Sequence, residues 1–152
     1  MTRYFDDVAV GDRFESQGTE SITREAILSF AREWDPQTYH TDEEVAKTSF
    51  AGGLSASAIH TLAMSTKLVH QSGFYDIVPI VGLGLDEVRM VRPVLADDRV
   101  RARVTITAMR ASKSRPGEGI ITNLTELINQ TGQVVLHFAL SELVKMRPRN
   151  LH

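Results

Sequence analysis

One helix that is apolar on most of its sides constrains this chain more than any other sequence feature. From Ser55 onward, small and apolar residues recur around the predicted helix, and they are Ala56, Ala58, Ile59, Leu62, Ala63, Met64, Leu68 and Val69. A surface helix keeps its apolar residues on one stripe, whereas a helix with this pattern is buried. The rest of the chain must therefore build the layer that surrounds it.

A sheet formed by the second half of the chain is predicted to be that layer. Its strand-like segments are residues 85–91, 100–110, 120–129 and 134–144. Links rich in turn residues separate them, at residues 93–98, 112–119 and 131–132. Because the links are short, consecutive strands are expected to be antiparallel neighbours. We predict an α+β fold, the hotdog architecture, in which a curved antiparallel sheet wraps one long helix as a single domain over residues 1–152.

An edge strand and a first helix are predicted near the amino terminus. Residues 14–22 suit an edge strand after a Gly-containing turn. Apolar residues with helical spacing then run up to Trp34, and Thr23 is placed to cap the amino end of this helix. Because Pro36 disfavours the helical conformation in the residue before it, Asp35 is expected just past the last turn.

A second short helix is expected soon after. Residues 41–44 read Thr-x-x-Glu, the capping-box form, which predicts a helix from Asp42 to about residue 47. His40 would then lie in the tight link between two helices. The Gly-containing segment 50–54 reads as a loop that leads to the central helix.

Composition argues against several classes of function. The formal net charge is -2 and no basic block exceeds two residues, so neither nucleic acid nor an anionic membrane is an expected partner. Without cysteine, the chain has no disulfides, thiolate zinc sites or cysteine nucleophile. The amino terminus lacks the apolar segment of a secretory signal, and no run of 18 uncharged apolar residues occurs. A cytoplasmic protein is therefore expected.

Asp35 and His40 form the candidate acid–base pair. They lie five positions apart across a helix exit and a new helix start, so both are expected to face one pocket. Addition of water to a double bond conjugated to a thioester needs a base, an acid for the α-carbon and a donor for the enolate oxygen. Aspartate and histidine supply the first two groups, but the sequence leaves open which is the acid.

Backbone N–H groups at the start of the central helix are the candidate donors for that oxygen. Ser57 and Ala58 follow the Gly52-Gly53 loop, and the first turn of a helix has free N–H groups at the positive end of its dipole. Gly53, Ser57 and Ala58 are therefore assigned to the substrate site.

The residues around Asp35 and His40 resemble the hydratase motif of MaoC-like proteins. The resemblance spans residues 4–144 and rests on segment 30–42, with Asp-Pro-Gln-Thr-Tyr-His, on segment 50–57, and on the Pro-Val step before Asp97-Asp98. One branch of the family reads Asp-x-Asn-Pro-x-His and another reads Asp-Pro-Gln-Pro-Phe-His. Asp35 and His40 match both branches.

This resemblance implies a function and an assembly. It implies a homodimer of single hotdog domains that reversibly adds water to a trans-2-enoyl thioester, giving an (R)-3-hydroxyacyl thioester. Coenzyme A or acyl carrier protein would carry the acyl group, with no further cofactor. Ser65 matches a serine that lines the pocket of related hydratases. The chain departs from the family where Thr38 replaces a proline, and where Ala58 and Asp97 each replace a glycine.

Other candidate groups have a simpler structural interpretation beside the functional one. His60 is either a second base or a buried histidine bonded to a backbone carbonyl. The scattered histidines lack metal-ligand spacing, so no metal site is predicted. Gly82-x-Gly84 precedes a strand and is interpreted as a turn. One group of arginines either covers a solvated strand face or holds the phosphates of coenzyme A, and it comprises Arg89, Arg92, Arg99, Arg101 and Arg103.

Two alternatives to hydration stay open from the sequence. A hotdog thioesterase would use Asp35 to activate water and leaves His40 unexplained, and a noncatalytic protein would bind acyl thioesters without turnover. The acyl chain length depends on the floor of the pocket, which residues 69–81 are expected to shape.

Overall fold

The structure, a computed structural model, describes residues 1–149. Its helices are η1 (Phe5–Asp7), α1 (Arg24–Trp34), α2 (Thr38–Thr41), α3 (Glu43–Lys47), α4 (Ala58–His70) and η2 (Phe74–Asp76). Its strands are β1 (Arg13–Glu15), β2 (Glu20–Ser21), β3 (Pro79–Met90), β4 (Arg99–Ala111), β5 (Glu118–Asn129) and β6 (Val134–Lys145).

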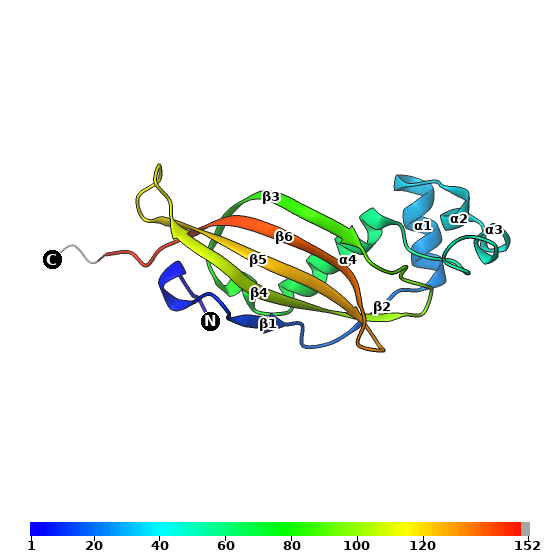
Figure 1. The fold of residues 1–152 in the computed structure, drawn as a ribbon, viewed down its shortest axis with the longest axis horizontal. Coiled ribbons are helices and arrows are strands. Elements are labelled where there is room, and N and C mark those ends of the chain that lie inside the picture. Colours follow the sequence, from blue (N-terminus) through cyan, green and yellow to red (C-terminus); the bar gives the residue numbers. More distant parts are fainter. Residues whose placement is uncertain (150–152) are drawn as a thin grey trace.

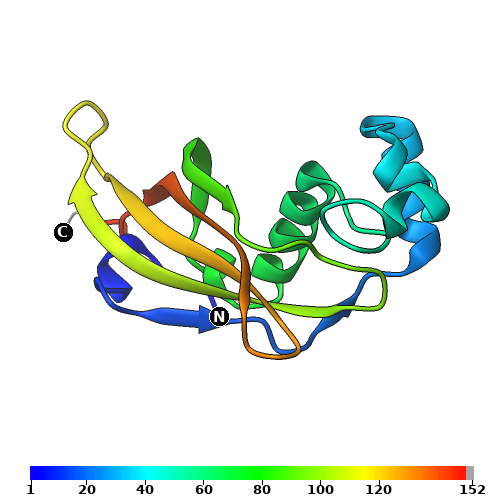
Figure 2. The same ribbon diagram turned by 45° about the vertical axis from the view of Figure 1, so that its right-hand side comes forward.

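All strands belong to one antiparallel sheet. The order is β1-β4-β5-β6-β3, and β2 also pairs with β4, so β3 forms one edge and the two short strands form the other. The sheet curves around α4, as Figures 1 and 2 show from two directions. The predicted α+β fold, a curved antiparallel sheet around one central helix, is confirmed.

The core lies between α4 and the concave face of the sheet. Leu68 of α4 is fully buried there, as are Val104 of β4 and Leu127 of β5. The opposite side of α4 is not covered, because the sheet wraps only part of the helix, and Ile59 is 45% exposed. The central helix is therefore buried on one side only, which corrects the expectation of burial on most sides.

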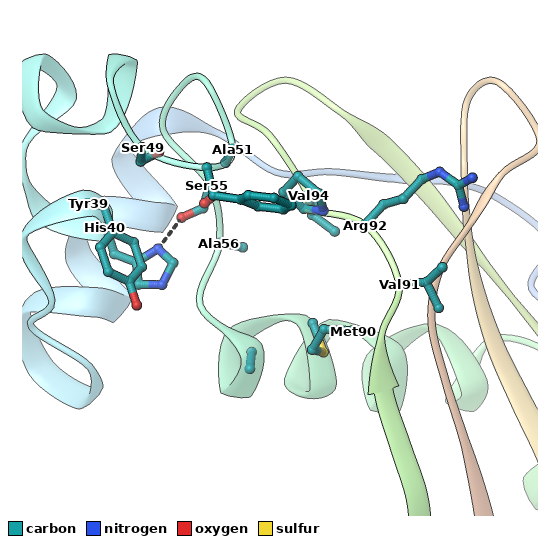
Figure 3. A pocket seen from close by; sticks show the side chains of 13 residues that line it. Tyr39, His40, Ser49, Ala51, Ser55, Ala56, Met90, Val91, Arg92 and Val94 are labelled. Atoms are coloured by element: carbon teal, nitrogen blue, oxygen red, sulfur yellow. Dashed lines mark hydrogen bonds between the residues drawn. The ribbon is translucent and has the colours of Figure 1, made fainter.

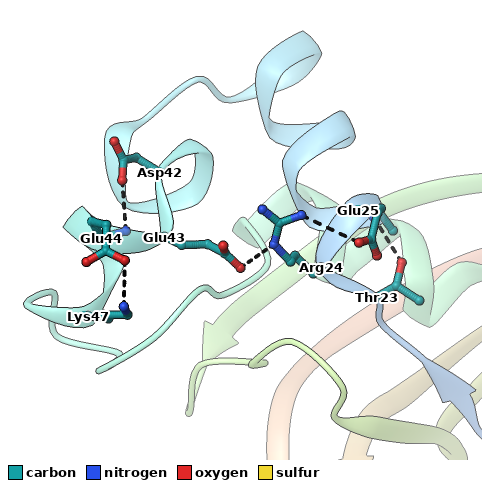
Figure 4. A network of polar contacts seen from close by, with 8 residues as sticks. Thr23, Arg24, Glu25, Asp42, Glu43, Glu44 and Lys47 are labelled. Atoms are coloured by element: carbon teal, nitrogen blue, oxygen red, sulfur yellow. Dashed lines mark hydrogen bonds and ion pairs between the residues drawn. The ribbon is translucent and has the colours of Figure 1, made fainter.

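The three helices α1, α2 and α3 lie together at one end of the sheet (Figure 1). Arg24 at the start of α1 forms an ion pair with Glu43 at the start of α3, which ties the first helix to the third (Figure 4). Thr23 caps α1 as predicted, because its hydroxyl accepts a hydrogen bond from the backbone N–H of Ala26. This cluster carries both members of the predicted acid–base pair.

The structure corrects several predicted boundaries in the first half of the chain. The segment 14–22 contributes two short strands that both pair with β4. Asp42, and not Thr41, caps α3 by accepting from the N–H groups of Glu44 and Val45. The central helix does start at Ala58, as expected, and the chain just before it is held extended by a hydrogen bond from Ala56 N–H to the Val94 carbonyl.

The first long strand, β3, starts earlier than predicted. It begins at Pro79, six positions before residue 85, and the Gly82-x-Gly84 segment predicted to be a turn lies within it. Proline and glycine obscure the strand pattern but are tolerated at a sheet edge, particularly beside bulges. The pairing of β3 with β6 shifts register at Pro79/Val81, Gly82/Gly84 and Asp86/Arg89.

One carboxyl group lies on the concave face of the sheet. Glu142 of β6 is only 5% exposed, and within residues 1–149 its Oε2 has no hydrogen-bond partner. Burial raises the pKa of Glu142 to about 7, although the nearby Tyr75 side chain acts in the opposite direction. Glu142 therefore binds a proton in the folded state at pH values where it is ionised in the unfolded chain.

We expect Glu142 to make the protein less stable as pH rises. A carboxyl group whose pKa is raised by folding stabilises the fold below its unfolded pKa and loses this effect as pH rises through the folded pKa. Between about pH 4 and pH 8, Glu142→Gln should gain roughly 2 to 3 kcal/mol relative to the native protein.

Urea unfolding at several pH values would measure this difference. Glu126→Gln is the matched control, because Glu126 lies on the adjacent strand and pairs with Arg103. A stability difference between native protein and Glu142→Gln that does not change with pH would contradict the expectation.

Candidate active site

His40 is held in a defined orientation by a backbone carbonyl. It lies in α2, a one-turn helix where the sequence predicted only a link, and its side chain is 7% exposed. Its Nδ1 lies 2.7 Å from the carbonyl oxygen of Ser55. Since a carbonyl can only accept, Nδ1 carries the proton, and in the neutral ring Nε2 is a free hydrogen-bond acceptor.

Asp35 ends α1 and begins the turn that leads to His40. Its backbone N–H donates to the Ala31 carbonyl at 2.9 Å, and its own carbonyl accepts from the N–H of Gln37 at 2.8 Å. The residue is half-buried, and within residues 1–149 its carboxylate has no hydrogen-bond or ion-pair partner. The carboxylate is therefore available to accept hydrogen bonds from a ligand or water.

The amino end of α4 presents free backbone N–H groups. Ser57 caps the helix: its hydroxyl accepts from the N–H of His60 at 3.2 Å, and the side chain is buried. The N–H groups of Ala58 and Ile59 have no acceptor within the part of the chain that the structure describes. These two N–H groups and the helix dipole favour an oxyanion at this position.

A cavity of about 490 Å³ brings His40 and Ala58 together (Figure 3). One wall comes from α2 and the segment before α4, and the other comes from the end of β3 and the residues that follow it. Most of the side chains that line the cavity are apolar, among them those of Ala56, Met90 and Val94. The arrangement combines a basic nitrogen, unpaired N–H groups and an apolar surface, which suits an acyl group with a reactive carbonyl.

The other predicted site residues lie outside the walls of this cavity. Asp35 and Ser57 flank it in sequence without lining it, and Gly53 contributes no wall either. Ser65 is fully buried, and its hydroxyl donates to the Leu62 carbonyl at 2.7 Å. Of the predicted residues, the structure therefore places His40 and Ala58 in the wall of one cavity.

Sequence reasoning missed the opposite wall and the group that orients His40. Residues 90–94 were assigned only to a strand end and a turn, yet five consecutive positions there line the cavity. The Ser55 carbonyl belongs to the backbone, so no residue type marks it. Phe50 also lines the cavity, and its side chain is fully exposed.

Only one of the five arginines singled out from the sequence lies at this cavity. Arg92 contributes to the wall and donates to the Val134 carbonyl at 3.3 Å. Arg101 and Arg103 form ion pairs with Glu15 and Glu126 on the outer face of the sheet. Arg101 and Arg103 therefore cover a solvated strand face, which is one of the two interpretations that the sequence allowed for this group of arginines.

His60 is not arranged as a second base. Its ring stacks on Phe30 with centroids 4.3 Å apart. Its Nδ1 is buried and has no hydrogen-bond partner within residues 1–149, so the expected carbonyl contact at this atom is absent there. Burial lowers the pKa of His60, which favours the neutral ring.

No group of three or more potential metal ligands lies together within residues 1–149. Within the same residues, no helix combines the length and the apolar character that crossing a bilayer requires.

Asp97 shows why the family pattern has a glycine at its position. Its backbone φ is 69°, in the left-handed region that glycine adopts without strain and that aspartate tolerates better than most residues. Its N–H donates to the Ile22 carbonyl at 2.7 Å. The substitution therefore keeps the turn that leads from the cavity wall into β4.

The fold is that of a hotdog protein, and its cavity has a histidine in a largely apolar wall. Residues 7–127 match the family model described as the MaoC like domain. The chain belongs to the MaoC-like dehydratase family, as its motif predicted.

Known relatives agree with this assignment. Protein YdeM of Bacillus subtilis (strain 168), itself uncharacterized, is 33% identical over 140 residues, covering 92% of this chain and 97% of YdeM. The MaoC-like dehydratase from Rhodospirillum rubrum has a TM-score of 0.88 and 39% identity, over 95% of this chain and 97% of that one. The (R)-hydratase PhaJ1 from Pseudomonas aeruginosa shares the fold, with a TM-score of 0.73 and 19% identity over 97% and 92% of the two chains.

Proposed function

We propose that this protein hydrates trans-2-enoyl-CoA to (R)-3-hydroxyacyl-CoA and catalyses the reverse dehydration. The observation that carries this proposal is the position of His40 in a cavity whose wall also contains the amino end of α4. A base and an oxyanion donor at one apolar cavity are the two requirements of conjugate addition to a thioester. PhaJ1 is an (R)-hydratase with the same fold, which supports this reaction class.

His40 is proposed to take the proton of the attacking water. The Ser55 carbonyl keeps the proton on Nδ1, so Nε2 is the basic atom. As the water oxygen bonds to C3, Nε2 takes one water proton and the π electrons of the C2–C3 bond move into an enolate. The resulting imidazolium returns that proton to C2, which places hydrogen and hydroxyl on the same face. Asp35 borders the cavity in sequence, and its carboxylate, which has no partner within residues 1–149, is proposed to accept a hydrogen bond from the second hydrogen of the water.

The developing enolate oxygen is proposed to bind the N–H groups of Ala58 and Ile59. A donor aimed at a developing oxyanion typically contributes about 100- to 1,000-fold in rate. The α4 helix has 13 residues, long enough for its dipole to add to the field at its amino end. An alanine at this position keeps the required N–H.

The structure favours hydration over the thioesterase alternative. A thioesterase that used Asp35 to activate water would give His40 no role, whereas His40 lines the cavity and the Ser55 carbonyl holds the proton on its Nδ1. Arg92 in the same wall offers a cation for a phosphate of coenzyme A, which supports this carrier.

A homodimer is proposed to cover the open side of the molecule. Edge strand β3 exposes apolar side chains, with Val81, Leu83 and Leu85 each about half exposed. The uncovered side of α4, including Ile59, is exposed as well. An unprotected apolar edge of this length pairs readily with another strand, and a second copy of β3 has the same pattern.

The first test is hydration of crotonyl-CoA and longer trans-2-enoyl-CoAs, followed as loss of enoyl absorbance. We expect His40→Ala to lower kcat/KM at least about 100-fold because the base is lost. Asp35→Asn should lower kcat/KM by about 100-fold, because the attacking water is no longer held in position. His137→Ala is the matched control, since His137 lies on β6 and does not line the cavity. Thioester binding without turnover by the native protein would favour the noncatalytic alternative.

Ala58→Pro tests the oxyanion donor. Proline is tolerated at the first position of a helix, and Ser57 already has the extended backbone (ψ 160°) that proline requires of its predecessor. We expect a folded protein whose kcat is about 100- to 1,000-fold lower, because one N–H is missing. Ala58→Ser, which keeps this N–H, is the control. Equal activity in both variants would remove Ala58 from the mechanism.

Light scattering tests the dimer. We expect the native protein to have the mass of two chains and Leu83→Lys to shift it toward one, because lysine on an edge strand opposes strand pairing. Val10→Lys changes an exposed apolar residue outside β3 and should leave the mass unchanged. A native monomer contradicts this arrangement, as does a Leu83→Lys protein that remains fully dimeric.

A further inference from the structure

A second cavity lies beside α4, on the side of the helix that faces β3 and β6. Its volume is about 410 Å³. Leu62 and Thr66 of α4 form one wall, Leu85 of β3 another, and Leu140 and Glu142 of β6 lie on the sheet side. The walls are largely apolar, with one carboxyl group among them.

The two cavities follow one another along the same two elements. Ala58 lines the first cavity, whereas Leu62 and Thr66 line the second, and the spacing of four residues puts all three on one face of α4. On β3, Met90 lines the first cavity and Leu85 the second. Ala58 and Thr66 are about 12 Å apart along the helix axis. An acyl chain held by its thioester at Ala58 can therefore extend along α4 toward the second cavity.

Two buried polar atoms on this face of the sheet lack partners. Within residues 1–149, neither Oε2 of Glu142 nor Nδ2 of Asn123 has a hydrogen bond, although both side chains are at least 95% buried. Asn123 lies opposite Leu140 in the register of β5 and β6, which places it diagonally from Glu142 on the same face. Natural proteins leave few buried polar atoms unpaired, so such a pair indicates a missing ligand or water.

The shape and chemistry of the second cavity favour an organic ligand over water. A water molecule occupies roughly 30 Å³, far less than this cavity, and needs two to four polar partners. Leu62, Leu85 and Leu140 offer none, and the polar side chains among the lining residues are those of Thr66, Tyr75, Thr125 and Glu142. An alkyl chain with one polar group at its end matches a cavity that has largely apolar walls and one carboxyl group.

We propose that the second cavity binds the distal end of the acyl chain, and that Glu142 selects chains with a hydroxyl group there. This inference rests on the proposed function. A hydroxyl group can donate a hydrogen bond to Oε2 of Glu142, a carboxyl oxygen of a lining residue that has no partner within residues 1–149. A methyl end leaves Oε2 of Glu142 unpaired, and a carboxylate end brings a second acidic group beside Glu142.

Calorimetric binding of two saturated thioesters of equal length, decanoyl-CoA and 10-hydroxydecanoyl-CoA, tests this selection without turnover. We expect the native protein to bind the hydroxylated thioester roughly tenfold tighter or more. Glu142→Leu should reverse the preference, and Glu142→Gln, which still accepts a hydrogen bond, should keep part of it. Glu126→Gln is the control and should leave the preference unchanged. Equal affinities in the native protein, or an unchanged preference in Glu142→Leu, would overturn the proposal.

Ala63→Phe tests the position of the chain independently of Glu142. Ala63 lines the second cavity and is exposed, so a larger side chain fills the cavity without entering the core. Because Ala63 lies one turn from Ile59 on the side of α4 proposed to be covered in the dimer, light scattering of this variant must give the native mass. We expect weaker binding of decanoyl-CoA relative to crotonyl-CoA, and an unchanged affinity ratio would place the chain elsewhere.

Failure of this inference and failure of the proposed function are distinguishable. Selective binding of 10-hydroxydecanoyl-CoA without hydration of crotonyl-CoA supports the second cavity and refutes the lyase. Hydration without selection between the two decanoyl thioesters supports the lyase and refutes the role of the second cavity. A protein that binds neither thioester refutes both.

Discussion

The packing of α4 against the concave face of the sheet is the contact on which the rest of the structure depends. It buries residues such as Leu68 and directs the amino end of the helix toward the residues that follow β3. Because helix termini leave N–H groups unpaired, this packing also creates the candidate oxyanion site. One hydrophobic contact thus supports both the stability of the fold and the proposed chemistry.

The second organising contact is the hydrogen bond between His40 and the Ser55 carbonyl. It joins the helical cluster α1–α3 to the extended segment that leads into α4. This bond selects the tautomer of His40 and fixes the direction of Nε2. The proposed base and the proposed oxyanion donors are therefore oriented by segments only a few residues apart, which limits their relative motion.

The helix and strand types could be predicted where the residue pattern is strong. The helix ending at Trp34, the central helix and the three strands from residue 100 onward follow their hydrophobic periodicity. The prediction was wrong for β3, because Pro79, Gly82 and Gly84 hide a bulged edge strand. It was also wrong for α2, since a helix of one turn contains too few residues to show a period. At the site, His40 and Ala58 lie in the wall of one cavity, whereas Asp35, expected to face the same pocket as His40, does not line it, and the wall at residues 90–94 was missed.

The sequence by itself determined the fold class, the family and the identity of the Asp35 and His40 motif, because these depend on local periodicity and short-range spacing. Only the tertiary structure decided which groups share a cavity, because residues 39–58 and residues 90–94 are distant in sequence and meet through tertiary packing. The buried state of Glu142 is the clearest case. Its residue type indicates a surface position, and only the curvature of the sheet around α4 removes it from water.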